Sequence, residues 1–223
     1  MLDTRVRELL APTLDRLGAR IAAFGVPALA LTGAGWLAGV AGCLAVASQH
    51  WFLGLVLWLA NRLLDGLDGP VARVRGATDL GGFLDIVADF SIYAGFVLAV
   101  AVAVPDARLA CTILLTAYYV SGTAFLALSS LVERRGGTLG DERSLRFVGG
   151  LAEGTETVIV YVLFCLLPAY AASIAWVFAA AVAVTAIHRV SFGIRVLRTA
   201  TPPPRSASTT TVSPVLPSHQ ESR

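Results

Sequence analysis

The segment 63–90, LLDGLDGPVARVRGATDLGGFLDIVADF, places four aspartates in one of the most apolar parts of the chain. Asp65 and Asp68 are three residues apart, and Asp85 and Asp89 are four apart. On helices, both spacings put the two side chains of a pair on one face. A short turn through Gly76 separates the pairs. If the flanking segments are neighbouring antiparallel helices, the four carboxylates converge on one site.

Such a cluster of carboxylates needs neutralisation at a membrane. A charged side chain at the centre of a membrane helix costs about 2.5–3.5 kcal/mol on insertion scales. Carboxylate oxygens suit hard divalent cations, so the cluster indicates Mg²⁺ or Mn²⁺. Two metal ions held between acidic residues are a recurring arrangement for displacement at phosphorus. The pattern therefore predicts a two-ion site formed by the four aspartates.

Small residues and an arginine beside the aspartates fit a phosphate ester. Gly69 lacks a side chain and lets a ligand approach the helix backbone. Ala72, one turn after Asp68, keeps the same face open. Arg73 can bind phosphate through its planar guanidinium.

The composition of the whole chain predicts a membrane protein. Of the 223 residues 56% are hydrophobic, and the mean hydropathy is +0.73. A soluble domain of this length could not bury so much apolar surface, and a helical span needs about 20 mostly apolar residues. The sequence predicts an all-α integral membrane protein with six transmembrane helices, at 28–48, 51–73, 82–104, 108–132, 151–168 and 171–197.

The basic residues orient this predicted bundle. All 17 are arginines, because the chain has no lysine. With the amino terminus in the cytoplasm, six spans leave only Arg108 on the far side, as the positive-inside rule requires. The carboxylates then face the cytoplasm. The net charge of +2 reflects this topology and does not indicate a nucleic-acid partner.

The sequence divides the chain into three parts. Residues 1–24 have apolar side chains at helical spacing, which predicts an amphipathic helix on the cytoplasmic leaflet or, alternatively, a helix that docks a partner. Residues 25–199 form the six-helix domain. Residues 200–223 are rich in Pro, Ser and Thr and predict a disordered tail without a catalytic role. Three single cysteines, Cys43, Cys111 and Cys165, are expected to be small buried residues.

The segment resembles the signature of class I CDP-alcohol phosphatidyltransferases, D-x2-D-G-x2-A-R followed after a short gap by G-x3-D-x3-D. All of its fixed positions match, at Asp65, Asp68, Gly69, Ala72, Arg73, Gly81, Asp85 and Asp89. The six-helix layout extends the resemblance to residues 5–198. It implies transfer of a phosphatidyl group from CDP-diacylglycerol to a small polar alcohol with release of CMP, in phospholipid biosynthesis. It also implies a bacterial inner-membrane enzyme that forms a homodimer.

The resemblance assigns roles to individual positions. The four aspartates would hold two divalent metal ions, and Asp89 would also act as general base on the acceptor hydroxyl. Thr32 lies where the family often has a polar residue lining the site. The residues that would contact the CDP group are Gly69, Ala72, Arg73 and Thr78.

The acceptor alcohol remains open. Glycerol 3-phosphate or an inositol phosphate would need cations, for which the candidates are Arg134, Arg135, Arg143, Arg146, Arg189 and Arg195. Each of these also fits a positive-inside anchor. The stretch GLAEGTETV places Glu153 and Glu156 where several members that use phosphorylated alcohols have basic residues. These glutamates would orient a hydroxyl-rich or amino alcohol, or pair with loop arginines.

Other functions fit parts of the pattern. An intramembrane prenyltransferase also uses aspartate-rich helices and Mg²⁺, but usually has two separated motifs and more spans. A cation-binding transporter or scaffold would spread its acids across the membrane depth. A charged helix–loop–helix at the membrane surface would pair its carboxylates with Arg62, Arg73 and Arg75. The single compact motif favours the phosphatidyltransferase.

Overall fold

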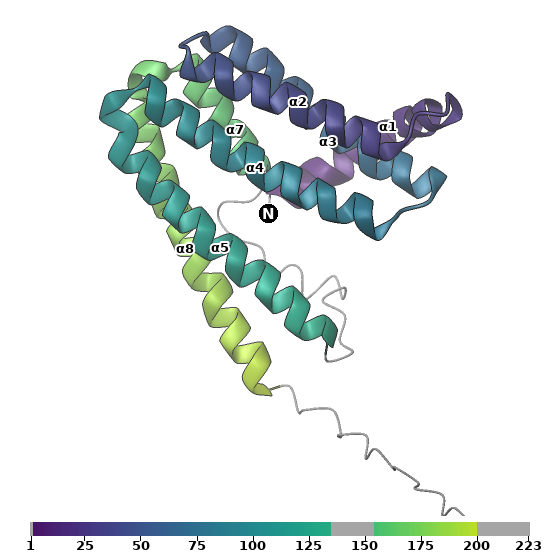
Figure 1. Ribbon diagram of the computed structural model, residues 1–223. Coiled ribbons are helices and arrows are strands. Elements are labelled where there is room, and N and C mark those ends of the chain that lie inside the picture. The colour runs from purple at the N-terminus through teal and green to yellow at the C-terminus, as the bar shows by residue number, and fades with distance from the viewer. Residues whose placement is uncertain (1, 135–153, 200–223) are drawn as a thin grey trace, which may run out of the picture.

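The computed structural model describes residues 2–134 and 154–199, and in these ranges it contains helices and no strands (Figure 1). The prediction of an all-α protein is confirmed. The α-helices are α1 (Leu2–Ala23), α2 (Ala28–Ala47), α3 (Trp51–Arg75), α4 (Asp79–Ala103), α5 (Arg108–Arg134), α7 (Gly154–Leu166) and α8 (Ala171–Thr199). Two one-turn 3-10 helices, η1 (Pro105–Ala107) and η2 (Pro168–Tyr170), precede α5 and α8.

Four helical stretches are long and apolar enough to cross a membrane: Ala28–Ala47, Asp79–Ala103, Pro105–Arg134 and Pro168–Arg198. The other two predicted spans, 51–73 and 151–168, do not meet the same criteria. The second half of α3 carries several charged residues, and the described part of α7 has only 13 residues. These two spans remain predictions.

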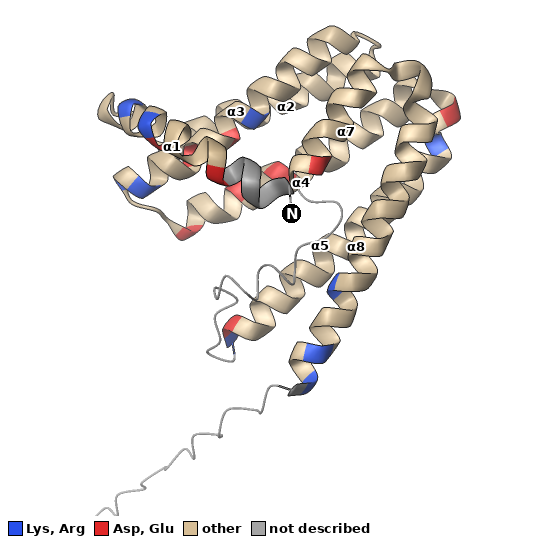
Figure 2. Ribbon diagram, turned by 180° about the vertical axis from the view of Figure 1, so that it is seen from behind, with Lys and Arg blue, Asp and Glu red and all other residues tan. Residues whose placement is uncertain are grey.

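The helices form two arms (Figure 1). The amino-terminal arm consists of α1 to α4, in which α2 packs against both α3 and α4 and α1 packs against α3. The carboxy-terminal arm is the pair α5 and α8. The arms meet at the end where η1 and η2 lie and diverge toward the opposite end (Figures 1 and 2).

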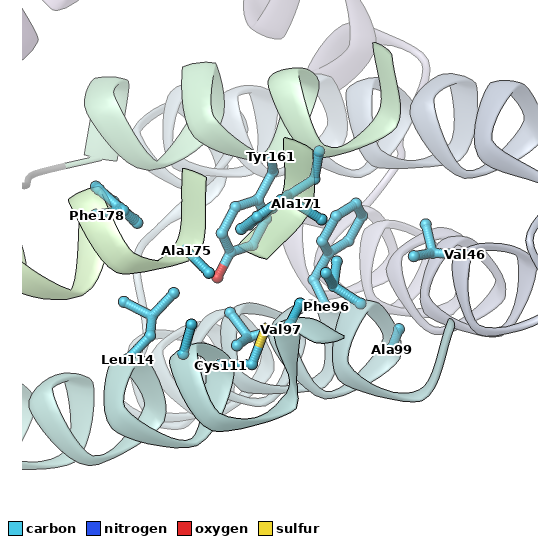
Figure 3. Close-up of a cluster of buried hydrophobic side chains, with 14 of the residues drawn as sticks. Val46, Phe96, Val97, Ala99, Cys111, Leu114, Tyr161, Ala171, Ala175 and Phe178 are labelled. Atoms are coloured by element: carbon cyan, nitrogen blue, oxygen red, sulfur yellow. The ribbon is translucent and has the colours of Figure 1, made fainter. Parts of the chain in front are cut away.

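A buried hydrophobic cluster that includes several aromatic rings fills the junction between the arms (Figure 3). The rings of Phe96 and Tyr161 stack with centroids 4.7 Å apart, and Trp58 lies 4.9 Å from Tyr161. The Tyr161 hydroxyl donates a hydrogen bond to the Tyr93 carbonyl oxygen at 2.7 Å. Aromatic pairs of this kind contribute about 0.5–1.5 kcal/mol beyond their buried area. The cluster therefore fixes α3, α4 and α7 relative to one another.

Glycines bring the helices of the amino-terminal arm close together. A Cβ on Gly54 would lie 2.5 Å from Val46 Cγ2, and a Cβ on Gly39 would lie 2.8 Å from Ile92 side-chain carbons. Small residues at such crossings allow close backbone approach, as in other membrane helices.

The predicted burial of the cysteines is confirmed for Cys111 and Cys165, whereas Cys43 is half-buried.

The turn between α3 and α4 differs from the predicted boundaries. We expected spans ending at residue 73 and resuming at 82, but α3 continues to Arg75 and α4 begins at Asp79. Gly76, with φ of 103°, ends α3. The Thr78 hydroxyl oxygen accepts a hydrogen bond from the Gly81 backbone N–H at 3.1 Å and caps α4. Hydropathy missed this first turn because Asp79 and the two following glycines lower it.

The amino-terminal residues Leu2–Ala23 form a helix, and part of its apolar face contacts protein. Leu14, Ile21 and Ala22 pack with Leu67 and Val71 of α3. Other leucines of the helix are exposed, among them Leu9 and Leu10. Its association with a leaflet remains a prediction.

Candidate active site

Three of the four predicted aspartates form a compact group between α3 and α4. One carboxylate oxygen from each of Asp65, Asp68 and Asp85 lies within 4.8 Å of the others. Asp68 is buried, and the Thr32 hydroxyl of α2 donates a hydrogen bond to its Oδ2 at 2.7 Å. Three hard oxygen donors at this spacing, one of them buried, fit a divalent cation such as Mg²⁺ or Mn²⁺.

Asp89 lies beside this group and is joined to it through Arg62. Arg62 Nη2 donates to Asp89 Oδ1 at 2.7 Å, and Arg62 Nη1 lies 3.4 Å from Asp65 Oδ2. We expected all four carboxylates to converge in the same way, so a metal-binding role of Asp89 remains a prediction. The sequence hypothesis gave Arg62 no role in the enzyme. The available signal was an arginine one turn before Asp65 in an apolar helix.

A cavity of about 420 Å³ opens beside the carboxylates. Asp68 and Asp85 belong to its wall, and so do three residues that we expected to contact CDP: Gly69, Ala72 and Thr78. The rest of the wall comes from the start of α2, the turn between α3 and α4, and the first turn of α4. Gly76, Gly81 and Gly82 keep this side of the cavity free of side chains. The structure therefore brings Asp68, Asp85, Gly69, Ala72 and Thr78 to one cavity, and their roles in binding stay predictions.

Arg73 departs from the expected placement. It is not among the residues that line the cavity, and its Nη2 donates to Asp15 Oδ1 of α1 at 2.7 Å. Its Nη1 nevertheless lies 3.5 Å from the position that a Cβ on Gly69 would occupy. Arg75, two residues later, does line the cavity, and its Nη1 donates to the Ala22 carbonyl oxygen at 3.4 Å. The sequence hypothesis assigned Arg75 no part in binding.

The candidate acceptor residues are distributed differently. Arg134, Arg189 and Arg195 belong to the carboxy-terminal arm. This arm carries basic residues toward its diverging end and also Arg108 at the junction end, where α5 begins (Figure 2). Arg189 Nη1 donates to the Ser121 hydroxyl oxygen at 3.0 Å, and its guanidinium lies 5.2 Å from the Phe125 ring centroid. Glu156 is in the first turn of α7. The other candidates lie outside the described residues: Arg135, Arg143, Arg146 and Glu153.

Residues 25–188 match the sequence model of a family described as CDP-alcohol phosphatidyltransferase. The chain belongs to this family. Membership confirms the resemblance of the signature and identifies the protein as a phosphatidyltransferase. It also sets aside the prenyltransferase, transporter and plain helix–loop–helix alternatives.

This phosphatidyltransferase is similar to a curated protein and to two solved structures. The chain is 38% identical over 207 residues to the inner membrane protein YnjF of Escherichia coli (strain K12), which covers 89% of this chain and 98% of YnjF. Two solved structures of the Mycobacterium tuberculosis phosphatidylinositol phosphate synthase PgsA1 are also similar. The complex with manganese and citrate has a TM-score of 0.65 at 22% identity, covering 81% of this chain and 88% of that one. The form with CDP-DAG bound has a TM-score of 0.61 at 23% identity, covering 81% and 92%. At these identities the likeness shows a shared fold.

Proposed function

We propose that this chain transfers the phosphatidyl group of CDP-diacylglycerol to a small polar alcohol and releases CMP, in phospholipid biosynthesis. One observation carries the proposal. The carboxylates of Asp68 and Asp85 line one cavity together with Gly69, Ala72 and Thr78, the residues expected to contact CDP. A cavity of about 420 Å³ falls within the ordinary range for ligand pockets, about 300–1,000 Å³. It offers room for a nucleotide next to a metal site.

Divalent cations complete this site in the proposal. Asp65, Asp68 and Asp85 would hold Mg²⁺ or Mn²⁺, and Asp89 would extend the group to two ions. When bound, these ions neutralise the diphosphate and stabilise the CMP that leaves. The manganese complex of PgsA1 supports this choice of metal. The Thr32 hydroxyl orients the Asp68 carboxylate toward the group by donating to Oδ2.

The chemical step needs a base for the acceptor hydroxyl. In the proposal Asp89 accepts the proton as the alcohol oxygen attacks the phosphatidyl phosphorus. The new phosphorus–oxygen bond forms while the bond to CMP breaks, and CMP leaves with that electron pair. The open backbone at Gly69 and the capped start of α4 at Thr78 would hold the nucleotide during this exchange.

The membrane arrangement is part of the same proposal. We place α3 and α7 across the membrane with the four more apolar helices, which gives six spans in residues 25–199. Residues 1–24 then lie on the cytoplasmic leaflet, and residues 200–223 form a tail without a catalytic role. The arginine distribution supports a cytoplasmic location for the carboxylates, and the relative YnjF is an inner membrane protein. A homodimer follows from family resemblance.

Release of CMP tests this function. The purified chain with Mn²⁺ and CDP-diacylglycerol would be given glycerol 3-phosphate, inositol phosphate, inositol, serine or glycerol in separate reactions. We expect CMP and a new phospholipid with one acceptor, glycerol 3-phosphate or an inositol compound being the first candidates. Absence of CMP with every acceptor, from protein shown to be folded, would overturn the proposal.

A further inference from the structure

Arg62 contacts both Asp65 of the carboxylate group and Asp89, although it lies outside the family signature. We propose that Arg62 is a positioning residue that holds the Asp89 carboxylate in one orientation for the chemical step. The proposal rests on the proposed role of Asp89 as the base. It gives Arg62 a role in turnover that differs from simple neutralisation of acidic neighbours.

The contacts of Arg62 connect two helices. From α3, its Nη2 donates to Asp89 Oδ1 of α4 at 2.7 Å, and its Nη1 lies 3.4 Å from Asp65 Oδ2. Hydrogen bonds between a guanidinium and a carboxylate are short, directional and stronger than neutral ones. In the proposal Oδ1 of Asp89 is engaged by Arg62, and Oδ2 is the oxygen that would serve an acceptor hydroxyl or a metal ion. The two carboxylate oxygens of Asp89 would then have different roles, one bound to Arg62 and the other available to the substrate or metal.

The guanidinium is itself held from several sides. Its carbon lies 4.8 Å from the ring centroid of Trp58 and 4.9 Å from that of Tyr93. Nη1 donates to the Tyr93 hydroxyl oxygen at 2.8 Å, and Nε donates to Asn61 Oδ1 at 2.8 Å. Asn61 is buried and donates from Nδ2 to the Gly35 carbonyl oxygen of α2 at 2.8 Å.

This arrangement exceeds what charge neutralisation needs. A buried cation could balance the aspartates from many positions, whereas the two rings and two polar partners restrict the guanidinium plane. Only 11% of the Arg62 side chain is exposed, so its rotation would break several contacts at once. Lysine is a poor substitute for an arginine whose planar guanidinium stacks on rings. An ammonium group cannot donate two parallel hydrogen bonds and has no flat surface to stack. Arg62→Lys therefore keeps the positive charge but removes the geometry of the guanidinium, so it distinguishes a positioning role from charge neutralisation.

The experiment compares Arg62→Lys and Arg62→Gln in the full chain, with Arg108→Lys as the matched control at the opposite end of the protein. Steady-state CMP release gives kcat and KM for CDP-diacylglycerol. EPR of free Mn²⁺ gives the metal affinity without turnover, and thermal unfolding reports stability. For Arg62→Lys we expect kcat to fall about tenfold or more, with KM and Mn²⁺ affinity within about twofold.

Arg62→Gln should separate catalysis from metal binding. Loss of a positive charge close to Asp65 should tighten Mn²⁺ binding at least about threefold while kcat still falls. A role confined to folding would lower kcat, Mn²⁺ affinity and stability together. If Arg62→Lys has the kcat of the natural protein, or if both variants lose Mn²⁺ affinity along with kcat, the proposal is overturned. Should the glutamine variant fail to fold, the lysine variant decides.

A double variant distinguishes failure of this inference from failure of the proposed function. If Arg62 acts through Asp89, Arg62→Lys should cause no further loss of the residual rate when added to Asp89→Asn. A further loss of tenfold would assign Arg62 a separate role and overturn the inference while leaving the base in place. Full activity of Asp89→Asn alone would remove the proposed base, and the inference with it.

Discussion

The two arms of the molecule satisfy the hydrogen bonds of their polar side chains in different ways. In the amino-terminal arm, side chains distant in sequence meet: Thr32 reaches Asp68, and Arg62 reaches Asp89. In the carboxy-terminal arm Thr112 and Thr116 bond to carbonyl oxygens four residues earlier, while Arg189 of α8 donates to Ser121 of α5. Preorganised chemistry needs groups fixed from several helices, whereas local bonds mainly satisfy the polar groups of a single helix. The difference supports the proposal that the metal and nucleotide chemistry belongs to the amino-terminal arm.

The largest expected effect comes from Asp68. Asp68→Asn keeps the shape but removes a buried ligand, so CMP release should fall by about a thousandfold or more, as losses of metal-bound chemistry do. Without metal, the variant should be as stable as the natural chain or more so, because one of several repelling carboxylates is gone. Thermal unfolding with and without Mn²⁺ checks this second expectation.

Asp106→Asn is the matched control for this prediction. Asp106 lies in η1, at the junction end, away from the carboxylate group. Its CMP release and its stabilisation by Mn²⁺ should equal those of the natural chain. Equal activity of Asp68→Asn and Asp106→Asn would contradict the location of chemistry on the amino-terminal arm.

The next effect concerns how closely helices approach in each arm. A Cβ on Gly39 would meet three side-chain carbons of Ile92 at 2.8–2.9 Å. Gly39→Ala should therefore destabilise the fold by about 1–3 kcal/mol, as overpacking does. In the carboxy-terminal arm, a Cβ on Gly193 would lie 3.7 Å from Leu128, an ordinary contact. Gly193→Ala should be neutral or stabilise by up to about 1 kcal/mol, because alanine favours helix.

Gly33→Ala controls for helix propensity within α2. A Cβ at Gly33 would meet no heavy atom within 4 Å, so this variant should not lose stability. Denaturant or thermal unfolding in the same detergent compares the three variants. If Gly39→Ala is as stable as Gly33→Ala, the close approach of α2 and α4 is not needed for the fold.

These comparisons also show which features of the structure can be predicted from local sequence. Spacing of three and four residues gave the faces of α3 and α4 correctly, because helical periodicity is a local property. Periodicity does not identify partners from distant segments, so the pairing of Arg73 with Asp15 was missed. It also gave no sign that Arg62 would lie between Trp58 and Tyr93. The start of α4 was missed because a hydroxyl cap at Thr78, rather than hydropathy, sets it.

A variant of Arg189 tests whether each arm binds a different one of the two substrates. Arg189 contacts Ser121 and Phe125 within the carboxy-terminal arm, and it is one of the candidates for holding the acceptor. Arg189→Gln should raise KM for the acceptor by about tenfold, the usual scale for a charged hydrogen bond, and leave KM for CDP-diacylglycerol unchanged. Steady-state kinetics with each substrate varied in turn measures both constants. An equal rise in both KM values would show that the arms do not divide the substrates.

The smallest effect is expected at the ion pair between Asp15 and Arg73. The pair is 54% and 65% exposed, so solvent screens it and its loss should change stability by less than about 1 kcal/mol. Its effect on binding should be larger, since Asp15 holds the Arg73 guanidinium beside Gly69 at the edge of the cavity. Asp15→Asn should raise KM for CDP-diacylglycerol about two- to fivefold by releasing a positioned cation. Glu8→Gln, on the same helix and also exposed, should change neither the stability nor the KM for CDP-diacylglycerol.

Arg73→Gln should raise the KM for CDP-diacylglycerol more than Asp15→Asn does. The double variant should match Arg73→Gln alone, because Asp15 acts through the Arg73 guanidinium. Additive losses in the double variant would mean that α1 affects the site by another route.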